Sequence, residues 1–98
     1  MEIAVTIIFD ACECQLIKYP EYYNMPMGGD SPRDNVVART AQGDILWDAA
    51  AVTGHRGWFG ANVFRKLDGE HLEVDTFEGV RYIINVASGT VSSKRITK

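Results

Sequence analysis

The chain has 98 residues, a length typical of one domain, and we predict a single domain over 1–98. Its 46% of hydrophobic and 23% of charged residues exclude a chain that is disordered throughout. The formal net charge of −3 argues against a nucleic-acid-binding module, because phosphate binding needs clustered Lys and Arg and the ten here are scattered. The one local basic cluster is Lys94, Arg95 and Lys98.

No run of residues approaches the roughly 20 apolar positions that a membrane-spanning helix needs, so we expect no membrane contact. The N-terminus does not resemble a secretion signal, since Glu2 is acidic and the apolar residues after it alternate as in a strand. Two cysteines without such a signal indicate a reducing compartment. We therefore expect a cytoplasmic protein.

The first predicted element runs from Glu2 to about Cys12 and alternates as a β-strand. One face holds Ile3, Val5, Ile7 and Phe9, and the other holds Ala4, Thr6 and Ile8. This pattern is typical of a strand buried on one face and mostly covered on the other. Apolar residues resume at Cys14, which indicates that the strand bends or bulges near 11–13 and continues toward Tyr19.

Residues 19–35 form one long predicted loop, because all three prolines and a Gly-Gly pair fall within them. Loops of this length in a compact domain are usually either binding loops or disordered, and the aromatic and methionine content argues against a disordered linker. Two interpretations stay open: the apolar residues of the loop close one end of the sheet, or they contact a partner. These residues are Tyr22, Tyr23, Met25 and Met27.

The next predicted strand is 35–41, and Gln42-Gly43 turns the chain. Residues 44–52 are ambiguous: the preceding turn favours a strand, whereas the three consecutive alanines and Gly54 as a stop favour a helix capped by Asp44. We predict a strand at the start of this segment and a short helical turn later.

Three glycines ten residues apart, Gly69, Gly79 and Gly89, each follow a residue that is common in turns. A two-residue turn that ends in Gly is a strong hairpin signal, because Gly adopts positive φ without steric cost. The spacing predicts a C-terminal meander of four strands at 62–67, 70–77, 80–87 and 90–96. The third should be central, and the fourth should be an exposed edge that its Lys and Arg protect from aggregation.

These elements predict a mainly β fold, either all-β or β-rich α+β. We expect a strongly bent antiparallel sheet or small barrel of about six or seven strands, with at most one or two short helices. Motifs for catalysis, nucleotides or dinucleotides are missing from the sequence, so we expect no cofactor. Cys12 and Cys14 lack the spacing of a zinc knuckle, and we expect them to be reduced, buried and free of metal.

Two functions remain open. The first is a non-enzymatic interaction or adaptor protein that contacts another protein, or a second copy of itself as a homodimer, through loop 19–29 and a sheet edge. The second is a small-molecule-binding protein or small enzyme with a site between loop 30–34 and the Gly-rich segment 54–60, where backbone amides and charged groups can converge. Its candidate residues are Asp30, Arg33, Asp34, His55, Arg56 and Trp58. The lack of catalytic motifs favours the first function.

Overall fold

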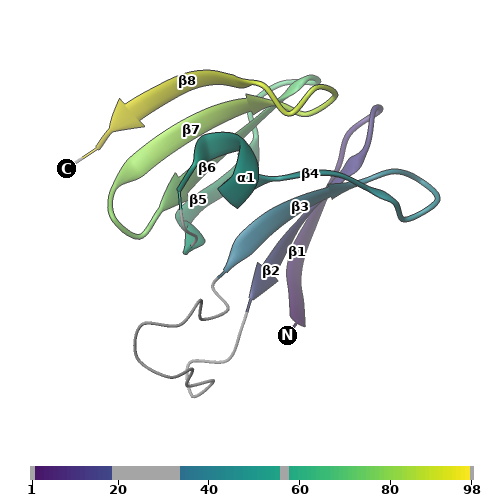
Figure 1. The fold of residues 1–98 in the computed structure, drawn as a ribbon, viewed down its shortest axis with the longest axis horizontal. Helices are drawn as coiled ribbons and strands as arrows, with labels where there is room; N and C mark the ends of the chain where they lie inside the picture. The colour runs from purple at the N-terminus through teal and green to yellow at the C-terminus, as the bar shows by residue number, and fades with distance from the viewer. Residues whose placement is uncertain (1, 19–33, 56–57, 98) are drawn as a thin grey trace.

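The computed structural model of the chain describes residues 2–18, 34–55 and 58–97. These residues form two antiparallel sheets of four strands each and one short helix (Figure 1). The predicted mainly β fold is therefore confirmed. The described residues contain eight strands where six or seven were expected, and the two sheets remain open instead of closing into a barrel.

Each sheet is a simple meander, in which consecutive strands are neighbours. The N-terminal sheet consists of β1 (Glu2–Ile8), β2 (Glu13–Lys18), β3 (Asn35–Arg39) and β4 (Ile45–Asp48), and helix α1 (Ala49–Thr53) follows it. The C-terminal sheet consists of β5 (Phe59–Lys66), β6 (His71–Thr76), β7 (Val80–Asn85) and β8 (Val91–Ile96).

The single bent strand predicted from Glu2 toward Tyr19 is wrong, because the chain reverses completely in this region. The Phe9 amide donates a hydrogen bond to the Cys12 carbonyl at 2.9 Å, so Asp10 and Ala11 form a two-residue turn between β1 and β2. None of these turn residues has positive φ, so the turn needs neither Gly nor Asn. The composition signal that marks most tight hairpins is therefore missing here.

The predicted burial of the first strand is also wrong. β1 is an edge of the N-terminal sheet, and Ile3, Val5 and Ile8 are 53%, 45% and 67% exposed. A bulge at Ala4 moreover moves Ile3 to the opposite face from Val5, because Ile3 pairs with Ile17 whereas Val5 pairs with Leu16. Alternation of apolar residues reports the faces of a strand but does not show whether another strand or layer covers them.

The prediction for residues 44–52 is confirmed, since strand β4 passes directly into helix α1. The helix cap is Asp48, not Asp44: its carboxylate accepts a hydrogen bond from the Ala51 amide at 2.9 Å. Gly54 ends the helix, as predicted from the sequence. It has φ of 71°, and its amide donates to the Ala50 carbonyl.

The predicted C-terminal meander is confirmed, with β7 in the interior of the sheet and β8 as an exposed edge. Its three turns use different chemistry. Gly79 and Gly89 adopt φ of 88° and 74°, as their hairpins require, whereas Gly69 does not have positive φ. In the first turn the Asp68 carboxylate accepts the Glu70 amide at 2.8 Å, so a side chain holds this turn in place of a left-handed glycine.

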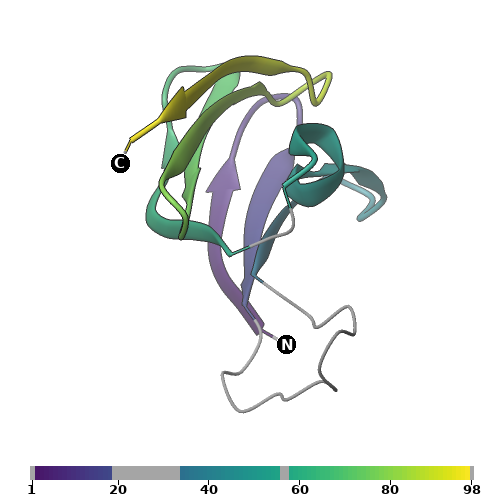
Figure 2. The ribbon, with the colours of Figure 1, turned by 60° about the vertical axis from the view of Figure 1, so that its left-hand side comes forward.

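The core lies between the two sheets, which Figure 2 shows as two layers with α1 beside them. Both sheets supply fully buried side chains: Cys14, Val36 and Ala38 come from the N-terminal sheet, and Phe59, Leu72, Val74 and Ile84 from the C-terminal sheet. One side chain also joins the two halves by a hydrogen bond, because the Trp47 indole Nε1 donates to the Val86 carbonyl at 2.8 Å.

The three turn glycines should differ in their tolerance of a methyl group. Gly69→Ala meets open space without positive φ, so its free energy of unfolding should change by less than about 0.5 kcal/mol. Gly79→Ala should cost about 1–2 kcal/mol for the left-handed backbone alone. Gly89→Ala should cost more, because its Cβ would lie 2.9 Å from Cγ of the buried Trp47. Urea denaturation of the three variants gives this order, and equal stabilities of Gly69→Ala and Gly89→Ala would contradict it.

Candidate functional site

Most of the residues singled out in the two loops lie outside the described part of the chain. These are Tyr22, Tyr23, Met25, Met27, Asp30, Arg33 and Arg56. The structure places Asp34, His55 and Trp58, together with the parts of the Gly-rich segment that flank 56–57. The site is therefore built from the residues around these three positions.

The end of the long loop and the Gly-rich segment meet through their backbones. The Phe59 amide donates to the Asp34 carbonyl at 3.1 Å, immediately before β3 and at the first residue of β5. This bond joins the two sheets at the end where the ligand site was expected. Phe59 is 1% exposed, so this part of the Gly-rich segment belongs to the core.

His55 is largely enclosed against the C-terminal sheet, with 14% of its side chain exposed. Its ring lies edge-on to Phe59 and Tyr82, at centroid distances of 5.7 and 6.5 Å. Its Nε2 lies 3.4 Å from the Glu78 carboxylate, and its Nδ1 is buried without a hydrogen-bond partner among the described residues. These contacts are those of a side chain that packs against the end of the core.

Trp58 and Phe77 form an aromatic pair beside His55. Their rings are 6.1 Å apart at an angle of 67°, and the Phe77 amide donates to the Trp58 carbonyl. Trp58 has φ of 59°, the one positive value at a non-glycine residue in the described part of the chain. The two side chains are 43% and 67% exposed. The sequence alone does not mark Phe77 as a partner of Trp58. Phe77 follows Thr76, which pairs with Phe59, so the two rings meet because of the register of β5 and β6.

Both cysteines are free and buried, as predicted. Burial raises the pKa of the Cys12 thiol, and burial together with the neighbouring Cys12 raises the pKa of Cys14. Cys12 Sγ donates to the Val86 carbonyl at 3.6 Å. Protonated and enclosed thiols are poor nucleophiles and poor metal ligands, so these cysteines contribute packing. The described residues contain no group of three or more His, Cys, Asp or Glu side chains that could hold a metal ion.

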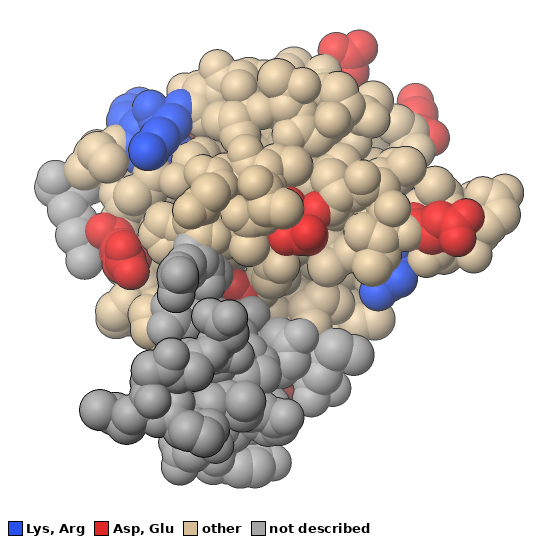
Figure 3. Space-filling view, in the orientation of Figure 1, with Lys and Arg blue, Asp and Glu red and all other residues tan. Residues whose placement is uncertain are grey.

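Charged side chains do not gather into a large patch of one sign on the face that Figure 3 shows, where separate Asp and Glu groups and fewer Lys and Arg lie on a mostly uncharged surface. The predicted basic cluster is also divided within β8. Lys94 pairs with Tyr82 and Arg95 pairs with Arg81, so the two neighbouring side chains point to opposite faces of the sheet. Lys98 lies outside the described residues.

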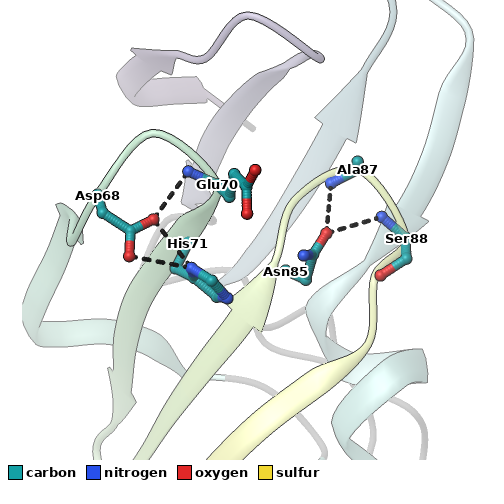
Figure 4. Close-up of polar contacts among 6 residues, drawn as sticks. All are labelled: Asp68, Glu70, His71, Asn85, Ala87 and Ser88. Carbon is teal, nitrogen blue, oxygen red and sulfur yellow. Dashed lines mark hydrogen bonds and ion pairs between the residues drawn. The ribbon is translucent and has the colours of Figure 1, made fainter.

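A polar cluster that the sequence did not indicate lies at one end of the C-terminal sheet (Figure 4). Both carboxylate oxygens of Asp68 contact Nδ1 of His71, at 2.9 and 3.0 Å. In the adjacent turn, the Asn85 side chain accepts from the Ala87 and Ser88 amides. These contacts engage both carboxylate oxygens of Asp68 and the side-chain oxygen of Asn85 within their own turns, and the cluster therefore caps two hairpins.

The sheet edges differ in how well they resist pairing with another chain. Strands β1 and β4 flank one sheet, and β5 and β8 flank the other. β4 has four residues, and β8 exposes Lys and Arg. The edge of β5 is interrupted by a bulge between Phe59 and Phe64, where the buried Asp75 carboxylate accepts the Asn62 and Val63 amides. Short length, charge and bulges are the features by which proteins protect sheet edges.

β1 has weaker protection, which consists of the small bulge at Ala4 and of Lys66, whose Nζ donates to the Ile8 carbonyl at the end of the strand. It has seven residues, it contains neither Pro nor Lys, and its one charged residue is Glu2 at the start. Ile3, Val5 and Ile8 remain exposed there. An uncharged, β-branched edge strand is a template on which another strand can pair, so β1 is the best candidate for a functional surface in the described chain.

Comparison of the chain with protein-family models, with curated proteins and with solved structures found no match. Helix α1, the one helix in the described part of the chain, has five residues and is too short to cross a bilayer. The functional argument therefore rests on the residues and their geometry.

The two cysteines should react slowly in the folded protein. Because burial raises the pKa of both thiols, modification by a maleimide at neutral pH should be at least about tenfold slower in buffer than in denaturant. Mass spectrometry at timed intervals measures both rates. Rapid labelling of either cysteine in the folded state would contradict the enclosed positions of the sulfurs.

The Asp68 carboxyl should titrate below the ordinary value for aspartate. The Glu70 amide and then the His71 side chain lower its pKa, so the carboxylate stabilises the turn at neutral pH and this contribution is lost as the pH falls through the lowered pKa. A carboxyl-detected NMR titration should show this low pKa, and His71→Ala should raise it only in part, because the Glu70 amide remains. An ordinary pKa in the wild-type chain would contradict the cap.

Proposed function

We propose that this chain is a protein-interaction domain without catalytic activity, and that it binds its partner by adding a strand to the open edge of β1. The observation that supports the proposal is the exposure of Ile3, Val5 and Ile8 on an edge without charged residues between Ile3 and Ile8. In other edge strands of the same chain, short length, charge or a bulge opposes such pairing.

The hydrogen bonds between β1 and β2 show which backbone N–H and C=O groups of β1 face away from the sheet. The Phe9 amide bonds to the Cys12 carbonyl, and hydrogen-bonded pairs alternate along an antiparallel ladder. Ile7 and Val5 therefore direct their backbone groups toward β2. Thr6 and Ile8 direct theirs away from the sheet. The Ile8 carbonyl already accepts a hydrogen bond from Lys66 Nζ at 3.0 Å, so the groups left for a partner strand are those of Thr6 and the Ile8 amide.

The side chains of β1 indicate the chemistry of the partner. Val5 pairs with Leu16 and Ile7 pairs with Cys14, so both lie on the face that continues the core. A partner strand would place its own side chains beside them, and β-branched apolar residues at alternate positions would extend the buried row. We therefore infer an extended segment that is apolar on this face and uncharged along its centre.

The apolar residues of segment 19–29 lie outside the described residues, and they stay a contact surface proposed on composition alone. A ligand site between segments 30–34 and 54–60 is the weaker proposal, because His55 and Phe59 there pack into the core.

A synthetic peptide tests strand addition directly. A fluorescent nine-residue peptide of alternating Val and Thr, with Lys at each end for solubility, should bind the chain saturably in an anisotropy titration. Thr6→Pro should weaken binding at least about tenfold, because it removes an outward N–H and leaves the ladder to β2 intact. Val5→Lys should also weaken it. The matched substitution Ser93→Lys, on the exposed edge β8, should have no effect.

Two outcomes would count against strand addition at β1. The first is the absence of saturable binding by the wild-type chain. The second is equal binding by wild type, Thr6→Pro and Val5→Lys when circular dichroism shows that all three are folded.

A further inference from the structure

We propose that Arg81 and Arg95 form an anion-binding site on the C-terminal sheet, and that its ligand is a phosphate group. The two arginines lie opposite each other on the neighbouring strands β7 and β8. This surface belongs to the other sheet from β1, so it is independent of the proposed strand addition.

The register of β7 and β8 brings the two side chains together. Arg81 pairs with Arg95, and two positions along, the next pair is joined by a hydrogen bond from the Thr97 amide to the Gly79 carbonyl at 2.6 Å. Hydrogen-bonded pairs recur at every second residue of an antiparallel ladder, so the two arginines form such a pair, with Cα atoms about 5.5 Å apart. Because Tyr82 points into the core, both arginine side chains leave the sheet on the face turned away from the core.

Carboxylates close to the two arginines are engaged elsewhere. None of the ion pairs among the described residues involves Arg81 or Arg95. Asp75 lies opposite Arg81 on β6, but its carboxylate accepts two amides of the β5 bulge. Glu73, the next acidic residue along β6, is paired with Arg65. Like charges directly opposite each other destabilise a sheet, so an anion bound between the two arginines relieves a repulsion that their neighbours leave in place.

Arg81 also has a buried donor that lacks an acceptor. Its side chain is half-buried, and its Nε is enclosed without a hydrogen-bond partner among the described residues. A buried N–H without an acceptor is costly, and native structures usually satisfy such groups. An oxyanion beside Arg81 supplies the acceptor, and the exposed Arg95 leaves the site accessible from solvent.

The chemistry of two guanidinium groups favours phosphate over a carboxylate. Each guanidinium presents its N–H groups as a planar fork that bonds two oxygens of one ligand. A phosphate group has at least three free oxygens and carries close to two negative charges at neutral pH, so it can bind both forks and offset both charges. A carboxylate has two oxygens and one charge, which suffice for one fork. Because water screens this open site, we expect a dissociation constant of about a millimolar.

An NMR titration with inorganic phosphate tests the site. At neutral pH and constant ionic strength, phosphate that replaces chloride should shift the Arg81 and Arg95 resonances saturably, and acetate should bind more weakly. Arg95→Ala should weaken phosphate binding at least about fivefold, and Arg81→Lys should weaken it because an ammonium keeps the charge but loses the fork. Lys94→Ala is the matched control: it removes one positive charge from the same exposed strand, but on the opposite face, and should leave binding unchanged.

Three results would overturn the site, provided that circular dichroism shows folded variants. The first is the absence of a saturable shift in the wild-type chain. The second is equal weakening by Lys94→Ala and Arg95→Ala, which would indicate attraction to positive charge in general. The third is acetate binding as tight as phosphate binding, which would overturn phosphate as the ligand class. The peptide titration at β1 tests strand addition separately, so its outcome does not bear on this site.

Discussion

The hydrogen bond from the Trp47 indole to the Val86 carbonyl is the contact on which the packing of the two halves most depends. Trp47 belongs to the N-terminal sheet and is 7% exposed, while Val86 follows the last residue of β7 in the other sheet. Cys12 donates to the same carbonyl, so two residues of the first sheet satisfy one buried acceptor of the second. Removing the indole donor would leave a buried carbonyl with only a weak thiol donor, a cost of about 1–3 kcal/mol. The close approach of Gly89 to the indole shows that the turn between β7 and β8, far beyond the helix in sequence, is shaped around this ring.

Two buried carboxylates of β6 hold the neighbouring edge strand β5 in an irregular shape. The Asp75 carboxylate is 3% exposed and accepts two amides of the β5 bulge, and Glu73 is paired with Arg65 at 2.5 Å. Buried carboxylates need such partners, because desolvation of an unpaired charge is costly. By holding the bulge, Asp75 removes β5 as a flat template for pairing. Along β1 the N-terminal sheet has only the bulge at Ala4 and the contact of Lys66 with the Ile8 carbonyl, so the middle of the strand stays open. This unequal protection is the physical basis for the proposed interaction surface.

The candidate site residues that the sequence indicates are not the residues that form the polar cluster in the structure. His55 was selected because glycines and an arginine surround it, yet its ring packs edge-on to Phe59 and Tyr82. Asp68 and His71 were not selected, although an acid three residues before a histidine at a turn is a local signal that the sequence contains. The exposed apolar edge of β1 could not be recognised in advance, because an alternating apolar strand has the same sequence pattern whether a neighbouring strand covers it or not.

The sequence by itself determined the elements whose signals are local. The Gly79 and Gly89 turns, the meander that they connect, and the passage from β4 into α1 with its stop at Gly54 all depend on backbone preferences of residues close together in the chain. Only the tertiary structure decided the reversal at Asp10 and Ala11, the division of the strands into two open sheets, and the position of β1 at an edge. The reversal is local, but it uses neither a glycine nor positive φ, so composition does not mark it. The division into sheets and the edge position of β1 depend on which strands pair and on which layer faces which, and periodicity within one strand carries no information about that.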